Sequence, residues 1–370
     1  MRTGTASLPL HGGHCPPWLF ERMQRLGPAI LEVIAREFGP AEVLRRLSDP
    51  YWFQAFGCVL GFDWHSSGLT TTLCGALKEG LRGREKDLGL VIAGGKGRTS
   101  RQTPREIATA ADRLALTSLQ PGELVYASRM AAKVDNTALQ DGYQLYHHVF
   151  CFTFDGRWAV VQQGMNETSR MARRYHWLSE GVQDFVCEPH AAICCDTKET
   201  ALNMVAGESQ ASRQVVTELG QQPPHKVVAE FNRILEAGLP DLALPWRHDV
   251  PRASYLNKAL LKVYDIQPRD FAAVLGVEGV GPKTIRALAM VAEVAYGAAA
   301  SFRDPVRYSF GHGGKDGHPY PVDRQVYDRS IAVLEQALAA AKIGHSDRMQ
   351  ALRRLGNFVS NETDLLPAGQ

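Results

Sequence analysis

Side chains of the kind that bind divalent metal ions recur in the first half of the chain. They are His11, His14, Asp63, His65, Asp135, Asp141, His147 and His148. Nucleases commonly hold one or two divalent ions with carboxylates and histidines, so that the metal activates a water and stabilises the transferring phosphate. We therefore expect a site for Mg²⁺ or Mn²⁺. Its favoured ligands are Asp135, Asp141, His147, His148 and His14. The alternative is structural, because Asp-Asn and Asp-Gly form turns and one of two adjacent histidines usually points inward.

A basic loop in the same half offers cations for a phosphate. Residues 94–101 read Gly-Gly-Lys-Gly-Arg-Thr-Ser-Arg, after a predicted strand and before a helix that begins at Thr103. The backbone amides of such a loop, together with its cations, can bind an anion. We expect Lys96, Arg98 and Arg101 to contact DNA. The spacing of a P-loop is absent, and an exposed flexible loop is the alternative interpretation.

A second basic segment combines arginines with aromatic residues. Residues 169–177 read Ser-Arg-Met-Ala-Arg-Arg-Tyr-His-Trp. This composition suits contact with a nucleic-acid backbone together with stacking of bases on the aromatic rings. Arg173 and Arg174 are the predicted DNA contacts. A helix with a solvated basic face and a buried tryptophan explains the segment equally well.

A glycine-rich turn between two apolar helices lies in the second half. Residues 279–286 read Gly-Val-Gly-Pro-Lys-Thr-Ile-Arg, and the stretch 271–297 as a whole resembles a helix-hairpin-helix. The glycines allow a tight turn whose N–H groups face outward at a helix N-terminus, where a phosphate oxygen can bind. Such contacts carry no sequence information. The predicted DNA contacts are Gly279, Gly281, Lys283, Thr284 and Arg286. The alternative is a helix-turn-helix corner with a glycine C-cap. A bulky residue at position 281 is expected to strain the turn.

The same half is similar to the endonuclease-III-like DNA glycosylases, which follow the hairpin with a Val-Asp pair that opens a helix. Here that pair is Val322-Asp323. The resemblance implies that Lys283 attacks the sugar as a Schiff-base lysine and that Asp323 stabilises the developing positive charge. The two residues are 40 positions apart, about twice the family's separation, so residues 307–320 would have to loop out. In the alternative, Lys283 contacts phosphate only and Asp323 is a first-turn carboxylate favoured by the helix dipole.

These groups require two kinds of domain to position them. The period changes over residues 147–163, where two largely apolar runs stand on either side of Asp155-Gly156, and this predicts a β-hairpin. Residues 88–93 and 124–127 are predicted as additional strands, and 16–47, 69–82 and 104–119 as helices. After residue 196 helical patterns follow one another without strands. We predict a mixed α/β domain over residues 1–195 and an all-α domain over residues 196–370 that contains the hairpin.

Composition narrows the class of protein. The 370 residues are 45% hydrophobic and 22% charged, with a net charge of +2. No apolar run reaches the roughly 18 residues of a membrane span, and the N-terminus has no apolar signal core. The seven cysteines lack CxxC spacing, which favours reduced thiols over a zinc site or disulfides. A cytoplasmic protein is expected. Since the net charge is small, DNA contacts must come from local patches.

Several segments together resemble a family found in archaea and bacteria and known only as a domain of unknown function. They are residues 2–5, 8–13, 146–148, 160–166 and 172–177. The resemblance covers essentially the whole chain and implies no activity. From the candidate sites we predict a protein that binds duplex or branched DNA through its backbone, in the first place a metal-dependent, structure-specific nuclease of DNA repair. The alternatives are a glycosylase/lyase using Lys283 and Asp323, and a non-enzymatic DNA-binding adaptor. The oligomeric state stays open.

Overall fold

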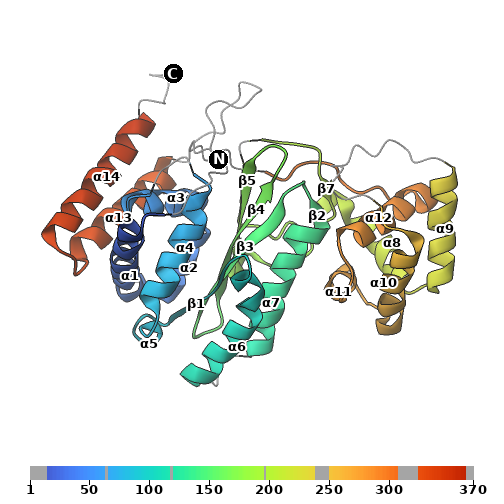
Figure 1. Ribbon diagram of the computed structural model, residues 1–370, viewed down its shortest axis with the longest axis horizontal. Coiled ribbons are helices and arrows are strands. Elements are labelled where there is room, and N and C mark those ends of the chain that lie inside the picture. Colours follow the sequence, from blue (N-terminus) through green and yellow to red (C-terminus); the bar gives the residue numbers. More distant parts are fainter. Residues whose placement is uncertain are drawn as a thin grey trace.

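The computed structural model describes residues 15–62, 66–116, 120–195, 197–237, 250–306 and 324–363; within the last range, side chains are described for 332–355. At its centre lies a five-stranded antiparallel sheet in the order β1-β3-β4-β5-β6 (Figure 1). The strands are β1 (Leu90–Lys96), β3 (Gln144–Thr153), β4 (Trp158–Asn166), β5 (Met171–Leu178) and β6 (Ala192–Cys194). Successive side chains of each strand point to opposite faces, so the two faces bury separate cores.

Helices from both ends of the chain cover one face of the sheet. They are α1 (Pro17–Phe38), α2 (Pro40–Ser48), α3 (Pro50–Val59), α4 (Gly68–Leu81), the short α5 (Glu85–Leu88), α13 (Arg324–Ala340) and α14 (His345–Thr363). Proline at the first position starts the first three, where its missing N–H costs nothing. Leu334 of α13 and Leu355 of α14 belong to the same core as Trp52 and as Ile92 and Val149 of the sheet.

The opposite face carries α6 (Thr103–Leu114) and α7 (Pro121–Lys133), which pack on Phe150, Phe152 and Val160. The same core continues into a group of helices on the right of Figure 1. They are α8 (Gln210–Gly220), α9 (Pro224–Glu236), α10 (Ala253–Ile266), α11 (Phe271–Gly276) and α12 (Pro282–Tyr296). Short connections complete the described fold: η1 (Thr99–Gln102), the π-helical turn η2 (Val134–Ala138), η3 (Ser179–Gly181) and η4 (Gly207–Ser209).

The mixed α/β character and the β-hairpin around Asp155-Gly156 are confirmed by the register of β3 and β4. The predicted strand at 124–127 is wrong, since these residues lie in α7, where Leu124, Ala127 and Ala131 are buried at helical spacing. Residues 171–178 form a strand rather than the alternative helix.

Elements from both sides of residue 195, the predicted domain boundary, pair and pack with one another. A short strand of the second half, β7 (Leu202–Asn203), pairs with β2 (Leu139–Gln140) of the first half, and Asn203 bridges to Ser301. The described second half is therefore not all helical. Its last two helices, α13 and α14, pack against α1 and α3 at the other side of the sheet (Figure 1). Among the described helices, none is both long and apolar enough to cross a membrane. All seven cysteines are free thiols.

Candidate nucleic-acid interface

Helices α11 and α12 are joined by a tight turn over residues 277–281. Gly279 has a φ of +94°, a backbone conformation that side chains disfavour, and the N–H of Val280 donates to the carbonyl of Val277 at 3.2 Å. Gly281 precedes α12 in an extended conformation, and its carbonyl accepts the first helical hydrogen bond, from Ile285. The first N–H groups of α12 have no partner within the helix and face its N-terminal end, where they can bind an anion.

Two polar side chains of the first half fix this turn in place. The Lys133 ammonium at the end of α7 donates to the carbonyl of Val280 at 2.6 Å and more weakly to that of Val277 at 3.4 Å. Burial lowers the pKa of Lys133. The amide of Gln140 donates to the carbonyl of Pro282 at 2.8 Å. The turn is thus held against the α/β core at both of its ends.

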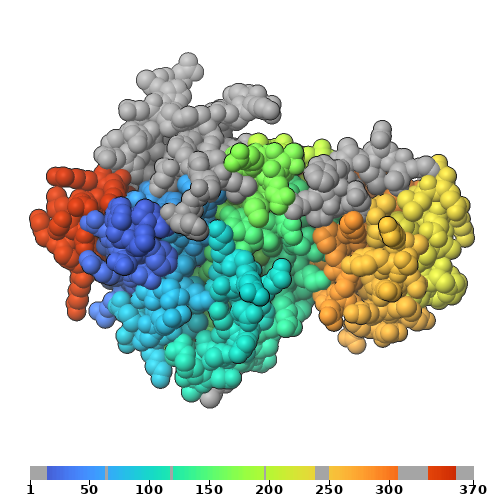
Figure 2. All heavy atoms as spheres, in the orientation of Figure 1, coloured from blue at the N-terminus to red at the C-terminus, as the bar shows by residue number. Residues whose placement is uncertain are grey.

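A cleft of about 840 Å³ opens between this turn and the first half. Its walls come from α7, from residues 100–104, from the beginning of β3 and from Gly276, Val280, Gly281 and Pro282. The orange surface of the α11–α12 segment lies beside the green surface of α7 in Figure 2. Arg101 and Arg129 also line the cleft; both are exposed, and neither forms an ion pair with a described residue. The helix N-terminus and two available guanidinium groups therefore share one concave surface.

The hairpin residues predicted to contact DNA divide into two groups. Gly279 and Lys283 are exposed, and Gly281 borders the cleft. Thr284 and Arg286 are buried in the packing of α12, and the Thr284 hydroxyl has no hydrogen-bond partner in the described part of the chain. A ligand can therefore reach the glycines and Lys283 directly, whereas contact with Thr284 or Arg286 would require the helix to rearrange.

The predicted cradle at residues 94–101 is partly occupied by the protein itself. The carboxylate of Glu106 accepts from the backbone N–H of Gly94 at 2.7 Å and from Lys78 at the same distance. Lys96 is exposed and lies over the Tyr146 ring, 5.8 Å from its centroid. Arg98 is also exposed. Of the three predicted cations, Arg101 is the one that lines the cleft.

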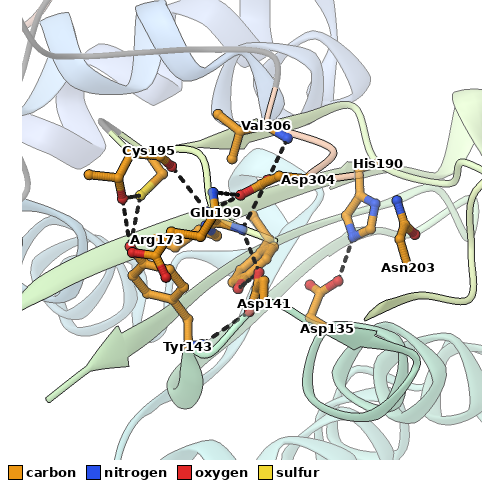
Figure 3. A network of polar contacts seen from close by, with 12 residues as sticks. Asp135, Asp141, Tyr143, Arg173, His190, Cys195, Glu199, Asn203, Asp304 and Val306 are labelled. Carbon is orange, nitrogen blue, oxygen red and sulfur yellow. Dashed lines mark hydrogen bonds and ion pairs between the residues drawn. The ribbon is translucent and has the colours of Figure 1, made fainter. Parts of the chain in front are cut away.

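Arg173 and Arg174, both predicted as DNA contacts, are fully buried instead. Arg173 donates to Asp141 and Asp304, each at 2.8 Å, and lies over the Tyr143 ring (Figure 3). Arg174 points to the other face of β5, where it donates to Gln54 at 2.9 Å and lies over the Phe53 ring. Buried arginines need such partners, because an unpaired charge in the interior is costly. Their position gives them a structural role and no surface for DNA.

The two predicted metal-binding carboxylates are engaged by neighbouring donors (Figure 3). Besides Arg173, the Asp141 carboxylate accepts from the hydroxyl of Tyr175 at 2.7 Å. The Asp135 carboxylate accepts from Gln162 at 2.5 Å and from the Trp177 indole at 2.9 Å, and it pairs with His190 at 2.5 Å. Among the described residues, no three His, Cys, Asp or Glu side chains are placed to hold a metal ion. As arranged, the carboxylates of Asp135 and Asp141 are used by partners within the protein and do not form a common site for Mg²⁺ or Mn²⁺; the predicted ligand His14 lies outside the described residues.

The adjacent histidines of β3 separate to opposite faces of the sheet. The His148 ring lies toward α7, where it contacts Ser128 at 2.9 Å and Gln162 at 2.8 Å. Neither ring nitrogen of His147 has a hydrogen-bond partner in the described structure. Burial, with a smaller contribution from His148, lowers the pKa of His147 to about 3. The two rings therefore do not form a common ligand pair.

His190 was not singled out by the sequence, since it stands alone in Glu188-Pro-His without any metal-ligand spacing. It lines a second cavity of about 390 Å³ together with Asn203 and Glu208.

Several predicted residues lie outside the described ranges. They are His11, His14, Asp63, His65 and Asp323. Of the predicted catalytic pair, Lys283 is therefore described by the structure and Asp323 is not.

Taken together, the chain is a mixed α/β protein whose antiparallel sheet supports a cleft bordered by a glycine-containing helical hairpin. It belongs to the family described as protein of unknown function DUF763, whose model matches residues 4–322. A search of curated proteins finds no match, and a search of solved structures finds none either. The family match covers residues 4–322 and carries no activity, so the chemistry depends on the residues of the site.

Proposed function

We propose that the protein binds the phosphate backbone of nucleic acid, DNA in the first place, in the cleft between the α11–α12 turn and α7. One observation carries the proposal: the N-terminus of α12 opens onto the same cleft as Arg101 and Arg129, which have no described counter-ion. A helix N-terminus and guanidinium groups both favour phosphate oxygens. Exposed Lys283 adds a further cation at the end of the helix.

The arrangement supports recognition of the backbone rather than of sequence. The amides at the start of α12 and the guanidinium groups of Arg101 and Arg129 contact phosphates, and such contacts position a nucleic acid without reading its bases. Binding of this kind depends strongly on salt, because each neutralised phosphate releases counter-ions. Since Asp135 and Asp141 already hold neighbouring donors, the contacts support binding more strongly than the predicted metal-dependent cleavage.

The first test measures the affinity for end-labelled single-stranded, duplex and branched DNA by fluorescence anisotropy over a series of salt concentrations. The decisive variant is Gly281→Val. Residue 281 has an extended backbone, and an added Cβ would meet no atom within 4 Å. The variant should therefore fold normally while its side chain blocks the approach of a phosphate to α12.

We expect Gly281→Val to weaken DNA binding about tenfold or more, which corresponds to about 1.4 kcal/mol. Gly181→Val is the matched control, because an added Cβ is also unobstructed there and the residue does not line the cleft. Equal affinity of Gly281→Val and the wild type would refute the proposed site. Parallel reactions with Mg²⁺, Mn²⁺ or EDTA and with borohydride show whether strand cleavage by either predicted enzymatic route accompanies binding.

A further inference from the structure

Three side chains behind the cleft form a continuous chain of hydrogen bonds. The Ser128 hydroxyl of α7 lies 2.9 Å from Nε2 of His148, and Nδ1 of the same ring lies 2.8 Å from Oε1 of Gln162. His148 and Gln162 face each other across β3 and β4 in the register of the sheet. Ser128 and His148 both line the cleft of about 840 Å³. Residues distant in sequence thus converge on one wall of the site.

The far end of this chain fixes the orientation of the Gln162 amide. Its nitrogen donates to the Asp135 carboxylate at 2.5 Å and to the backbone carbonyl of Ala131 at 3.2 Å. A carbonyl can only accept a hydrogen bond, so the NH₂ group of Gln162 must face Ala131 and the oxygen must face His148. The buried Asp135, itself held by Trp177, supports the same orientation.

This orientation determines which nitrogen of His148 carries the proton. Oε1 of Gln162 is an acceptor, so Nδ1 of His148 must donate to it. The unprotonated Nε2 then faces the hydroxyl of Ser128, which becomes the donor of that hydrogen bond. Burial lowers the pKa of His148, which keeps the ring in this neutral form. No other hydrogen bond of the Ser128 hydroxyl occurs within the described chain.

A hydroxyl bonded to a histidine base that a third group orients is the arrangement found in activated nucleophiles. The geometry points to Ser128 as a nucleophile toward a phosphate ester bound in the cleft, with His148 as its general base and Gln162 as a positioning residue. This inference rests on the proposed binding of nucleic acid, which would supply the phosphodiester. Arg101 and Arg129 in the same cleft suit the negative charge of the transition state.

The proposed step balances without a metal or a redox partner. The oxygen of Ser128 forms a bond to phosphorus while its proton moves to Nε2 of His148. The bond from phosphorus to the leaving sugar oxygen breaks, and the imidazolium returns the proton to that oxygen. Water, deprotonated by the same ring, then attacks the phosphoserine diester. The bond to the serine oxygen breaks, that oxygen regains its proton, and the second nucleic-acid end leaves as a phosphomonoester.

The test uses the full-length protein and a fluorophosphonate probe, which a serine nucleophile attacks with loss of fluoride. We expect a single adduct on Ser128, mapped by peptide mass spectrometry, and no adduct in Ser128→Ala. His148→Gln should slow labelling about a hundredfold or more, the usual contribution of a general base. The control is Ser100→Ala, since Ser100 also lines the cleft but donates to the carbonyl of Gly97.

Two further variants separate chemistry from folding. Ser128→Cys should retain the fold and react with iodoacetamide faster than any other cysteine, because His148 then faces a thiol. Gln162→Glu keeps the shape of the side chain but places a second carboxyl against Asp135. Titration of this pair should change the pH profile of labelling, which a merely structural residue would not do. The inference would be overturned if the folded wild type were not labelled on Ser128 by the fluorophosphonate. It would also be overturned if His148→Gln were labelled as fast as the wild type.

DNA binding is measured separately from the labelling of Ser128. DNA affinity of the wild type is measured by anisotropy in parallel with the labelling. Binding without modification of Ser128 would refute the nucleophile and leave the proposed function standing. Labelling of Ser128 in a protein that binds no DNA would refute the proposed function. Ser128 would then be a nucleophile toward a phosphate ester other than nucleic acid.

Discussion

The ammonium of Lys133 donates a hydrogen bond of 2.6 Å to the carbonyl of Val280, and so connects the end of α7 to the turn between α11 and α12. This contact joins residues 147 positions apart in the sequence. Because the Lys133 ammonium is bonded to the turn, it is not free to bind a phosphate. Among the described residues that line the cleft, Arg101 and Arg129 are the cations that remain for an anionic ligand. The geometry of the interface therefore depends on a lysine that does not itself have to touch a ligand.

Lys133→Met tests this connection. The methionine keeps most of the apolar stem and removes the hydrogen bonds to Val280 and Val277, which should cost about 1–3 kcal/mol, as for other hydrogen bonds of charged groups. We expect the amides of residues 277–281 to exchange faster with deuterium and DNA affinity to fall. Lys226→Met, an exposed change in α9, is the control. Unchanged exchange at 277–281 would show that Lys133 does not hold the turn.

The two glycines of the turn provide a matched pair of substitutions. Gly279 has a positive φ of +94°, whereas Gly281 is extended. Gly279→Ala should therefore lower the free energy of unfolding by about 1–2 kcal/mol, and Gly281→Ala should leave it nearly unchanged. Chemical denaturation of both variants measures the difference. The expectation from sequence that a bulky residue at 281 strains the turn is wrong, because the positive φ falls on the first glycine.

Local patterns in the sequence were sufficient for some elements. The two largely apolar runs on either side of Asp155-Gly156 predicted the β3–β4 hairpin, because the turn type suits a hairpin connection there. The strand predicted at 124–127 was wrong because four residues are too few to distinguish a buried strand from one face of a helix. The pairing of β7 with β2 was not predictable, as strands of two residues carry no periodicity.

The candidate site was harder to predict, because its chemistry depends on contacts between distant residues. Arg173 and Arg174 form a basic pair in sequence, yet Arg173 is neutralised by Asp141 and by Asp304, 131 residues away. The chain from Ser128 through His148 to Gln162 likewise joins a helix and two strands. Residue types indicated that Asp135 and His148 were of interest, and only the fold shows what each one contacts.

Asp141→Asn distinguishes a structural carboxylate from a metal ligand. Removing the charge leaves Arg173 with Asp304 as its single buried counter-ion, and breaking a buried ion pair usually costs about 3–5 kcal/mol. We expect a clearly lower midpoint of urea unfolding. Asp112→Asn on the exposed side of α6 is the control. A variant as stable as the wild type that has lost metal-dependent cleavage would instead revive the predicted metal site.

The stability of the protein should fall in acid because His147 resists protonation. Its pKa is about 3 in the folded protein and about 6.5 in an unfolded chain. Between these values the unfolded chain binds the proton and the folded one does not, so stability decreases as the pH falls from about 6.5 toward 3. His148 and His176 have lowered pKa values and act in the same direction.

His147→Gln removes one of these groups. Between pH 7 and about pH 4.5 the variant should lose about 2–3 kcal/mol less stability than the wild type, at 1.36 kcal/mol for each unit of pKa difference. Urea denaturation at the two pH values gives this difference directly. His225→Gln, at an exposed position of α9, should change nothing. An identical loss in His147→Gln and the wild type would show that His147 is protonated in the folded protein.

Arg129→Gln tests whether the cleft neutralises phosphates. Arg129 is exposed on α7, lines the cleft and has no described ion-pair partner, so its loss should leave the fold intact. If it contacts one phosphate, the slope of log affinity against log salt concentration should decrease by about 1. Arg82→Gln at the end of α4, where Arg82 pairs with Glu79, is the control and should keep the slope. A weaker affinity with an unchanged slope would mean that Arg129 supports the cleft without touching the backbone of the nucleic acid.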